Sequence, residues 1–353
     1  MDQEQRRIEF EKLPFDKERM TRGGVGRTGL RVGGEGSGDA KKKGSDGKKK
    51  VDSNPGVVAG VLVATVAVTL VTWGARAYSG AVSRVTSPRV VEFEIKGGKR
   101  LSKKQPKIEW VGMGKSIDKV VVELRGTYAV YVYDFETGEE WGRSEKKEMQ
   151  AASLMKLPVL IALYKEAERG RIDLDSKYSL VAADKVGGSG SMFYKSAGTV
   201  FTYRKMAELM GQQSDNTAYN VAVKLLGRKK IEETINEMGL SGTDFALSSM
   251  SAYDAGTLLR KLYRGQILNR ENGDEILRFL SGTIYEDRIP AGVPTGVRVA
   301  HKVGTEAGVV SDAGIIYGDR PYVLVVMSEG AGLEEARKAL PSISTIVWGF
   351  FKR

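Results

Sequence analysis

The stretch Ala151-Ala-Ser-Leu-Met-Lys-Leu-Pro158 decides how this sequence is interpreted. Ser153 and Lys156 are three residues apart, so they share one face if the segment is helical. Pro158 lacks a backbone N–H and is tolerated only in the first turn of a helix, which places Ser153 at or just before the helix start. A serine hydroxyl is a weak nucleophile until a neighbouring base takes its proton, and the Lys156 amine is placed to do so. Taken alone, this spacing is also typical of an ordinary exposed helix start.

The segments on either side of this stretch differ in hydrophobic period. Before it, residues 127–134 are rich in β-branched and aromatic residues and predict a strand, and the turn at 136–138 leads to a second one. From residue 297 the pattern predicts three more strands, over 297–303, 309–317 and 322–327. Elsewhere the period is helical, and we expect helices over 116–125, 154–167, 203–210, 216–226, 229–238, 254–263, 274–280 and 333–351.

This order of elements predicts the fold class. Two strands, many helices, three strands and a closing helix suit an α/β (α+β) sandwich. We expect an antiparallel sheet formed by both ends of the domain, with an all-helical subdomain inserted between them, over residues 113–353.

The chain before residue 113 has a different composition. The net charge of the chain is +11, and a polar, glycine-rich segment, 1–52, contains the lysine runs 41–43 and 48–50. We expect this segment to be a disordered, basic cytoplasmic tail that binds no nucleic acid. Residues 53–75 carry no charge, and we predict a transmembrane signal anchor over 53–78, followed by a connector over 79–112. A buried core helix and a cleaved signal peptide are the alternatives. The predicted anchor contacts the lipid bilayer through residues 53–78 and places the folded domain outside the cytoplasm.

The residue inventory excludes several kinds of site. The chain has no cysteine and one histidine, His301, so disulfides, thiolate sites and multi-histidine metal sites are excluded, and we expect no metal or cofactor. His301 directly precedes Lys302 on a predicted strand, so the two side chains point to opposite faces. We therefore expect His301 to be packed or hydrogen-bonded and not catalytic.

Two further motifs, together with the stretch 151–158, indicate a catalytic site. Ser214-Asp-Asn216 lies between two predicted helices, and Lys302-Val-Gly304 lies on the first of the late strands. S-x-x-K, S-D-N and K-[ST]-G in this order resemble class A β-lactamases and penicillin-binding proteins. The resemblance covers residues 113–353 and includes Thr137-Gly-Glu-Glu, Gly188-Ser-Gly190 and Asp312-Ala-Gly-Ile-Ile-Tyr.

The resemblance implies how protons move during acyl transfer. Ser153 is the nucleophile that becomes acylated, and Lys156 is its general base or part of a proton relay. Ser214 passes the proton to the leaving nitrogen. Lys302 holds Ser214 in place and attracts the substrate carboxylate.

The resemblance also implies how the substrate is bound. Asn216 holds the amide side chain of the substrate. The backbone N–H groups of Ser153 and Thr305 form the oxyanion hole. Gly304 leaves room for the substrate to pair along the strand edge.

The sequence departs from the family pattern at two places. Val303 stands where the family has Thr or Ser, so the hydroxyl that binds the carboxylate is missing unless Thr305 replaces it. Class A β-lactamases deacylate with a loop glutamate, whereas the matching region here, residues 242–254, contains none. Asp244 is the one candidate substitute, and aspartate is shorter.

Three functions remain open on these residues. The first is a membrane-anchored, monomeric β-lactamase-like serine hydrolase that forms an acyl-serine with β-lactams or D-Ala-D-Ala-type peptides and turns over weakly. The second is a penicillin-binding-type D,D-carboxypeptidase acting on peptidoglycan stem peptides. The third is a sensor of β-lactams or muropeptides that becomes acylated without hydrolysis.

Overall fold

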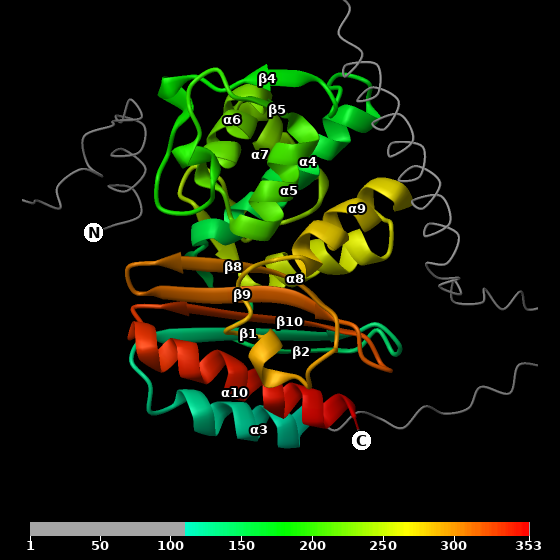
Figure 1. Cartoon of the computed structure of the whole chain (residues 1–353). Coiled ribbons are helices and arrows are strands. Elements are labelled where there is room, and N and C mark those ends of the chain that lie inside the picture. Colours follow the sequence, from blue (N-terminus) through cyan, green and yellow to red (C-terminus); the bar gives the residue numbers. More distant parts are fainter. Residues whose placement is uncertain (1–109, 353) are drawn as a thin grey trace, which may run out of the picture. The chain divides into compact units, whose positions relative to one another are not determined.

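One antiparallel sheet joins the two ends of the folded chain. The computed structural model describes residues 110–352. Its five-stranded sheet has the order β2-β1-β10-β9-β8, so strands from the beginning and the end of the domain lie side by side (Figure 1). The strands are β1 Thr127–Asp134, β2 Glu140–Arg143, β8 Val299–Glu306, β9 Val309–Ile316 and β10 Tyr322–Glu329.

The central strands are covered on both faces. Every residue of β9 is buried, as is every residue of β10 except the last, which explains their nearly continuous apolar sequence. Helices α3 (Trp110–Val121) and α10 (Leu333–Phe351) cover one face, and α8 (Ala252–Tyr263) covers the other (Figure 1). Because β8 lies at the edge of the sheet, one of its sides is free of strand pairing and is available to build a site.

The first helix lies earlier than predicted. It spans Trp110–Val121 and not 116–125, and it includes the last three residues of the expected connector over 79–112. The buried residues Met113, Ile117 and Val121 recur every fourth position, whereas Val122 is 73% exposed. The apolar stripe therefore ends at Val121, and the helix ends with it.

The inserted region is mostly helical but not entirely so. Its helices are α4 Lys156–Glu168, α5 Tyr203–Gln213, α6 Asn216–Leu226, α7 Arg228–Glu237, α8 and α9 Arg270–Ser281. It also contains short strands, which we did not predict: β4 (Lys177–Ser179) pairs with β5 (Val200–Thr202), and β7 (Ser249–Ser251) pairs with β3 (Glu148–Gln150) and β6 (Thr243–Asp244). Strands of two or three residues are too short to show a period of two.

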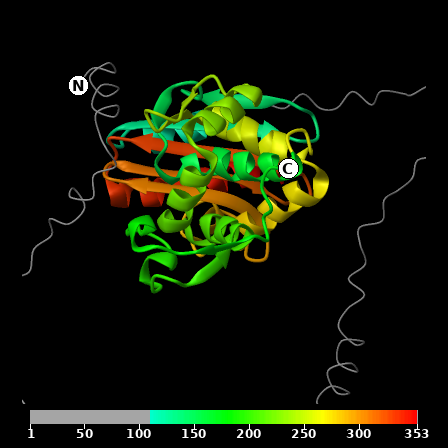
Figure 2. The same cartoon turned by 90° about the horizontal axis from the view of Figure 1, so that it is seen from above.

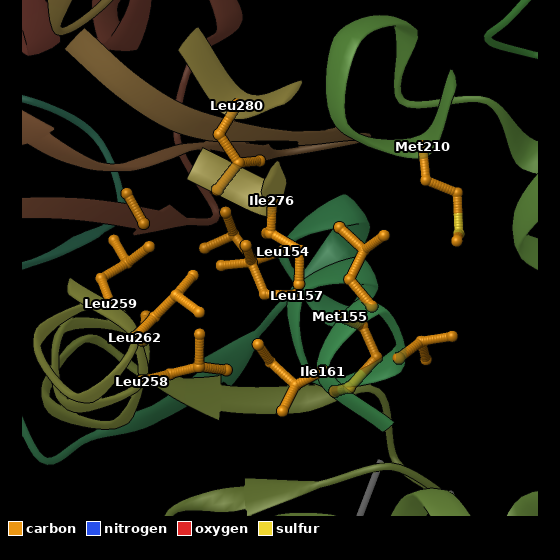
Figure 3. Close-up of a cluster of buried hydrophobic side chains, with 14 of the residues drawn as sticks. Leu154, Met155, Leu157, Ile161, Met210, Leu258, Leu259, Leu262, Ile276 and Leu280 are labelled. Carbon is orange, nitrogen blue, oxygen red and sulfur yellow. The ribbon is translucent and has the colours of Figure 1, made fainter. Parts of the chain in front are cut away.

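Helix α4 is the centre of the larger core. Nearly every residue of it from Lys156 to Tyr164 is buried, so it lacks a polar face. Leucine, isoleucine and methionine side chains from η1 (Ala152–Met155), α4, α5, α8 and α9 converge around it (Figure 3). The inserted helices lie over one face of the sheet (Figure 2). This burial fixes the start of α4, where the predicted nucleophile lies.

The sheet formed by both ends of the domain with an inserted, mainly helical region confirms the predicted architecture. The tail, the anchor over 53–78 and most of the connector lie outside the described residues. Within residues 110–352, no helix is both long and apolar enough to cross a bilayer.

Two helical glycines test the packing of this fold. A Cβ on Gly256 of α8 would lie 2.2 Å from the Tyr131 ring, whereas one on Gly349 of α10 would have no neighbour within 4 Å. Gly256→Ala should lower the free energy of unfolding by about 1–3 kcal/mol through overpacking. Gly349→Ala should raise it by about 0.4–1 kcal/mol. Urea unfolding of both variants measures the difference, and equal effects would contradict this packing.

Candidate active site

The predicted nucleophile lies on a tight turn in front of α4. The 3₁₀ turn η1 (Ala152–Met155) leads directly into α4, so Ser153 precedes the helix as predicted. Ala152 has a φ of 45°, a left-handed conformation that costs an alanine energy. Leu154 and Met155 are buried and anchor the turn, while Ser153 lines a cleft.

Lys156 is buried beside Ser153. Lys156 is only 3% exposed. Its Nζ lies 2.9 Å from Ser153 Oγ and 2.7 Å from Asn216 Oδ1. Burial lowers the pKa of Lys156 to about 8, and the Asp215 carboxylate opposes part of that effect. A substantial fraction of the amine is therefore neutral near physiological pH and can accept the proton of Ser153.

Ser214 occupies a sharp turn between α5 and α6. Its φ is 53°, and the next residue, Asp215, begins α6 by accepting a hydrogen bond from Ala218 N–H. The buried Asp215 also accepts a 2.8 Å hydrogen bond from Met192 N–H. A Cβ on Gly190 would lie 2.1 Å from the Asp215 carboxylate, so glycine is required where the loop containing residues 187–191 meets this turn. These contacts direct Ser214 into the cleft.

Asn216 connects Lys156 to the wall of the cleft. Its Oδ1 accepts from Lys156, and its Nδ2 donates a 2.8 Å hydrogen bond to Gly187 O. Ser189 Oγ donates to Ser214 O at 2.6 Å. Gly188 and Ser189 line the cleft, so this wall is mainly backbone. One Nδ2 hydrogen of Asn216 is left over for a substrate carbonyl, consistent with the predicted role.

Lys302 holds the second serine. Its Nζ donates 2.8 Å hydrogen bonds to Ser214 Oγ and to Val303 O, and the residue is only 1% exposed. Burial, and then the charge of Lys156, hold the pKa of Lys302 well below its usual value. Two serine–lysine pairs, Ser153–Lys156 and Ser214–Lys302, thus face one another across the site.

The cleft between these pairs has a volume of about 330 Å³. It is lined by Ser153, Gly188, Ser189, Ser214, Asn216, Tyr285, Val303 and Thr305. We predicted that Gly304 leaves room for substrate, and a Cβ there would lie 2.9 Å from Ala151 O and 3.4 Å from Leu154. The glycine therefore also lets β8 approach the nucleophile turn closely.

Arg288 is a functional candidate that the sequence did not reveal. It is 2% exposed, and its Nη1 donates to Gly304 O at 3.0 Å and to Ser311 O at 2.6 Å. Its Nη2 donates to Thr305 Oγ1. The hydroxyl of Thr305 therefore keeps its own hydrogen free for a substrate anion in the cleft. A lone arginine in an irregular segment carries no recognisable pattern in the sequence.

His301 is packed behind the site, as predicted. It is fully buried, and its Nδ1 lies 2.9 and 3.0 Å from the two carboxylate oxygens of Asp312. It does not line the cleft. No group of three or more histidine, aspartate or glutamate side chains in the described part of the chain could hold a metal ion.

No carboxylate lines the cleft within the described residues. Asp244, the candidate deacylating residue, accepts a 2.9 Å hydrogen bond from Leu247 N–H and stabilises its own turn. The site can activate Ser153 and protonate a leaving group through Ser214. It offers no carboxylate base to activate water.

The chain resembles known proteins in sequence. Residues 113–351 match the family model described as Beta-lactamase enzyme family. The β-lactamase VEB-1 of Pseudomonas aeruginosa is 22% identical over 231 residues, which cover 56% of this chain and 77% of that protein.

Solved structures of related proteins have a similar fold. PBP-A is 25% identical with a TM-score of 0.65, over 68% of this chain and 95% of that one. A β-lactamase of Sphaerobacter thermophilus is 25% identical with a TM-score of 0.64, over 68% and 97%.

The lowered pKa of Lys156 can be observed directly. In the full chain with isotope-labelled lysine, the Lys156 side chain should titrate with a pKa of about 8 by NMR, whereas a lysine in water titrates near about 10.4. Lys156→Met assigns the signal. Ser153→Ala should leave the pKa low, because burial and not the serine is its main cause. A Lys156 signal that titrates like a lysine in water would contradict the buried site.

Proposed function

We propose that this chain, which belongs to the β-lactamase enzyme family and is a serine hydrolase of the β-lactamase type, forms an acyl-serine at Ser153 with β-lactams and with D-Ala-D-Ala-type peptides. We propose further that it hydrolyses this intermediate slowly. The observation that carries the proposal is the cleft with two serine–lysine pairs, where no carboxylate of residues 110–352 belongs to the lining.

Acylation follows from the contacts at Ser153. The neutral Lys156 amine takes the proton as Ser153 Oγ attacks the substrate carbonyl carbon. The backbone N–H groups of Ser153 and Thr305 stabilise the oxygen anion that forms. Ser214 then gives its proton to the leaving nitrogen, the C–N bond breaks, and Lys302 supports Ser214 during this transfer. These four side chains account for formation of the acyl-enzyme.

Substrate recognition follows from the cations around the cleft. Lys302 lies beneath it, and Arg288 polarises the Thr305 hydroxyl at its edge. Both attract the carboxylate that β-lactams and D-Ala-D-Ala peptides carry. Val303 contributes no hydroxyl, so Thr305 is the remaining donor on this part of β8.

Hydrolysis requires a base that activates water against the acyl group. Asp244 accepts a hydrogen bond from Leu247 N–H within its own turn. Within the described residues, the polar groups that line the cleft are hydroxyls, the Asn216 amide and backbone groups, and the Lys156 amine lies next to this lining. Slow deacylation favours a penicillin-binding-type D,D-carboxypeptidase as the second candidate. The transmembrane anchor proposed for residues 53–78 would place either activity at the outer face of a membrane.

Labelling and turnover can be separated experimentally. The full chain in detergent should bind a fluorescent penicillin covalently and keep it for many minutes, while a chromogenic cephalosporin is hydrolysed only slowly. Ser153→Ala should abolish the labelling. Release of D-alanine from a D-Ala-D-Ala peptide would favour the carboxypeptidase.

Two outcomes of this experiment would contradict the proposal. One is rapid, sustained hydrolysis of the cephalosporin. The other is labelling that Ser153→Ala leaves unchanged.

The third motif offers a second test. Val303→Thr introduces a hydroxyl at the edge of the cleft, and one hydrogen bond to the substrate carboxylate is worth about 1–3 kcal/mol. We expect the second-order rate of penicillin labelling to rise by roughly tenfold or more. Val303→Ala is the control, because it changes the volume without adding a donor. An unchanged rate in Val303→Thr would show that Thr305 already fills this role.

A further inference from the structure

An irregular segment, residues 283–289, which we call the strap, connects two sides of the site. At its start, Thr283 Oγ1 and Ile284 N–H both donate to Gln212 O, at 3.1 and 3.0 Å. Gln212 belongs to the last turn of α5, which leads directly into Ser214. The start of the strap is therefore fixed to the turn that carries the second serine.

The other end of the strap is fixed to the sheet. Arg288 Nη1 donates to Gly304 O of β8 at 3.0 Å, and its Nη2 donates to Thr305 Oγ1. The next residue, Ile289, donates its N–H to the Asp312 carboxylate of β9 at 3.1 Å. The strap therefore runs from the end of α5 to the part of β8 where the predicted oxyanion hole lies.

Tyr285 is the strap residue that lines the cleft. Its hydroxyl donates to Gln213 O at 3.2 Å, and Gln213 directly precedes Ser214. The residue is half-buried, and its ring is the apolar surface that the strap offers to the cleft. The wall that contains Gly188 and Ser189 is small and polar by comparison. The apolar surface of the cleft is therefore concentrated on one side.

The leaving groups of the proposed substrates have a common shape. In a D-alanine terminus and in a penicillin, one carbon atom joins the leaving nitrogen to the carboxylate. With the nitrogen at Ser214 and the carboxylate at Thr305, this carbon lies between the two residues that the strap connects. The methyl group of D-alanine and the dimethyl-substituted ring of a penicillin lie on or next to this carbon. Such apolar groups are the parts of the substrate that meet Tyr285.

We propose that Tyr285 is a specificity-determining residue whose ring forms the wall of a subsite for leaving groups with apolar surface beside the carboxylate. This inference rests on the proposed function, because it concerns the acylation of Ser153. Contact with the ring removes apolar surface of the leaving group from water. The acyl side of the substrate, which Asn216 holds, does not share this contact. Tyr285 therefore selects among leaving groups and not among acyl groups.

The test compares two β-lactams that carry the same phenylacetyl side chain. Penicillin G has the dimethyl-substituted ring fused at the leaving nitrogen. The matched monobactam has no fused ring and carries a sulfonate on that nitrogen. Each compound competes with a fluorescent penicillin for the full chain in detergent, and the loss of labelling gives its second-order rate of acylation.

Two substitutions separate the ring of Tyr285 from its hydrogen bond. Tyr285→Gln removes the ring but keeps a donor for Gln213 O, and it should lower the rate with penicillin G by roughly tenfold relative to the rate with the monobactam. Tyr285→Phe keeps the ring and removes the donor, so it should keep the wild-type ratio of the two rates. A merely structural defect would lower both rates together and leave their ratio unchanged.

Ile284→Ala is the matched control. Ile284 precedes Tyr285 on the strap, but its side chain is 67% exposed and does not line the cleft. Its replacement should leave both rates unchanged. If circular dichroism shows that Tyr285→Gln does not fold, Tyr285→Ala takes its place, and the ratio should fall in the same way.

The outcomes separate the two proposals. Absence of labelling in the wild-type chain would overturn the proposed function. Normal wild-type labelling with an unchanged ratio in Tyr285→Gln would overturn the subsite alone, and so would a ratio that Tyr285→Phe or Ile284→Ala lowers as much as Tyr285→Gln does.

Discussion

Two buried lysine amines, each in contact with a serine hydroxyl, are the constraint on which the site depends. Lys156 and Lys302 are 3% and 1% exposed, and their Nζ atoms lie 2.9 and 2.8 Å from Ser153 Oγ and Ser214 Oγ. Removal of an ammonium ion from water costs several kcal/mol. At Lys156 this cost lowers the pKa to about 8, so part of the amine is neutral near physiological pH and can accept a proton. The same burial that destabilises the charge therefore makes the amine useful as a base.

The fold supplies the opposing charges and the rigidity that such burial requires. Asp215 begins helix α6 and offsets part of the burial cost at Lys156. Asp312 does the same for Lys302 from within the sheet. The two lysines come from different layers, α4 and β8, and meet because Gly304 lets the strand approach the nucleophile turn. A shift of β8 against the helices would separate Lys302 from Ser214, whereas Ser153 and Lys156 would stay together because η1 leads directly into α4.

Much of the fold and of the candidate site could be predicted from the sequence. The features that could not be predicted have physical causes. The strands and most helices follow from hydrophobic period, and five of the six polar side chains of the three motifs form one connected group around the cleft. Helix α3 was misplaced because its stripe of Met113, Ile117 and Val121 begins before the expected domain start. Arg288 could not be identified, because its role comes from long-range contacts to β8 and β9 and no local pattern encodes it. The close approach that Gly304 permits could not be predicted for the same reason, since the atoms next to it belong to a distant turn.

The segment between α7 and α8 explains why the second half of the reaction lacks a carboxylate in the cleft. After α7 ends at Glu237, the chain forms the short strands β6 and β7 and enters α8 at Ala252. The buried Asp254 accepts hydrogen bonds from Gly242 N–H at 2.7 Å and from Thr243 Oγ1 at 2.8 Å, and so ties the beginning of this segment to α8. Asp244 is committed to the turn that follows. The segment nevertheless reaches the nucleophile turn, because Ser248 O accepts a 2.9 Å hydrogen bond from Ala151 N–H. What it brings to that turn is Ser248 and Ser249 and not a glutamate or aspartate. The identity of the side chains on this segment, and not its distance from Ser153, therefore accounts for the missing base.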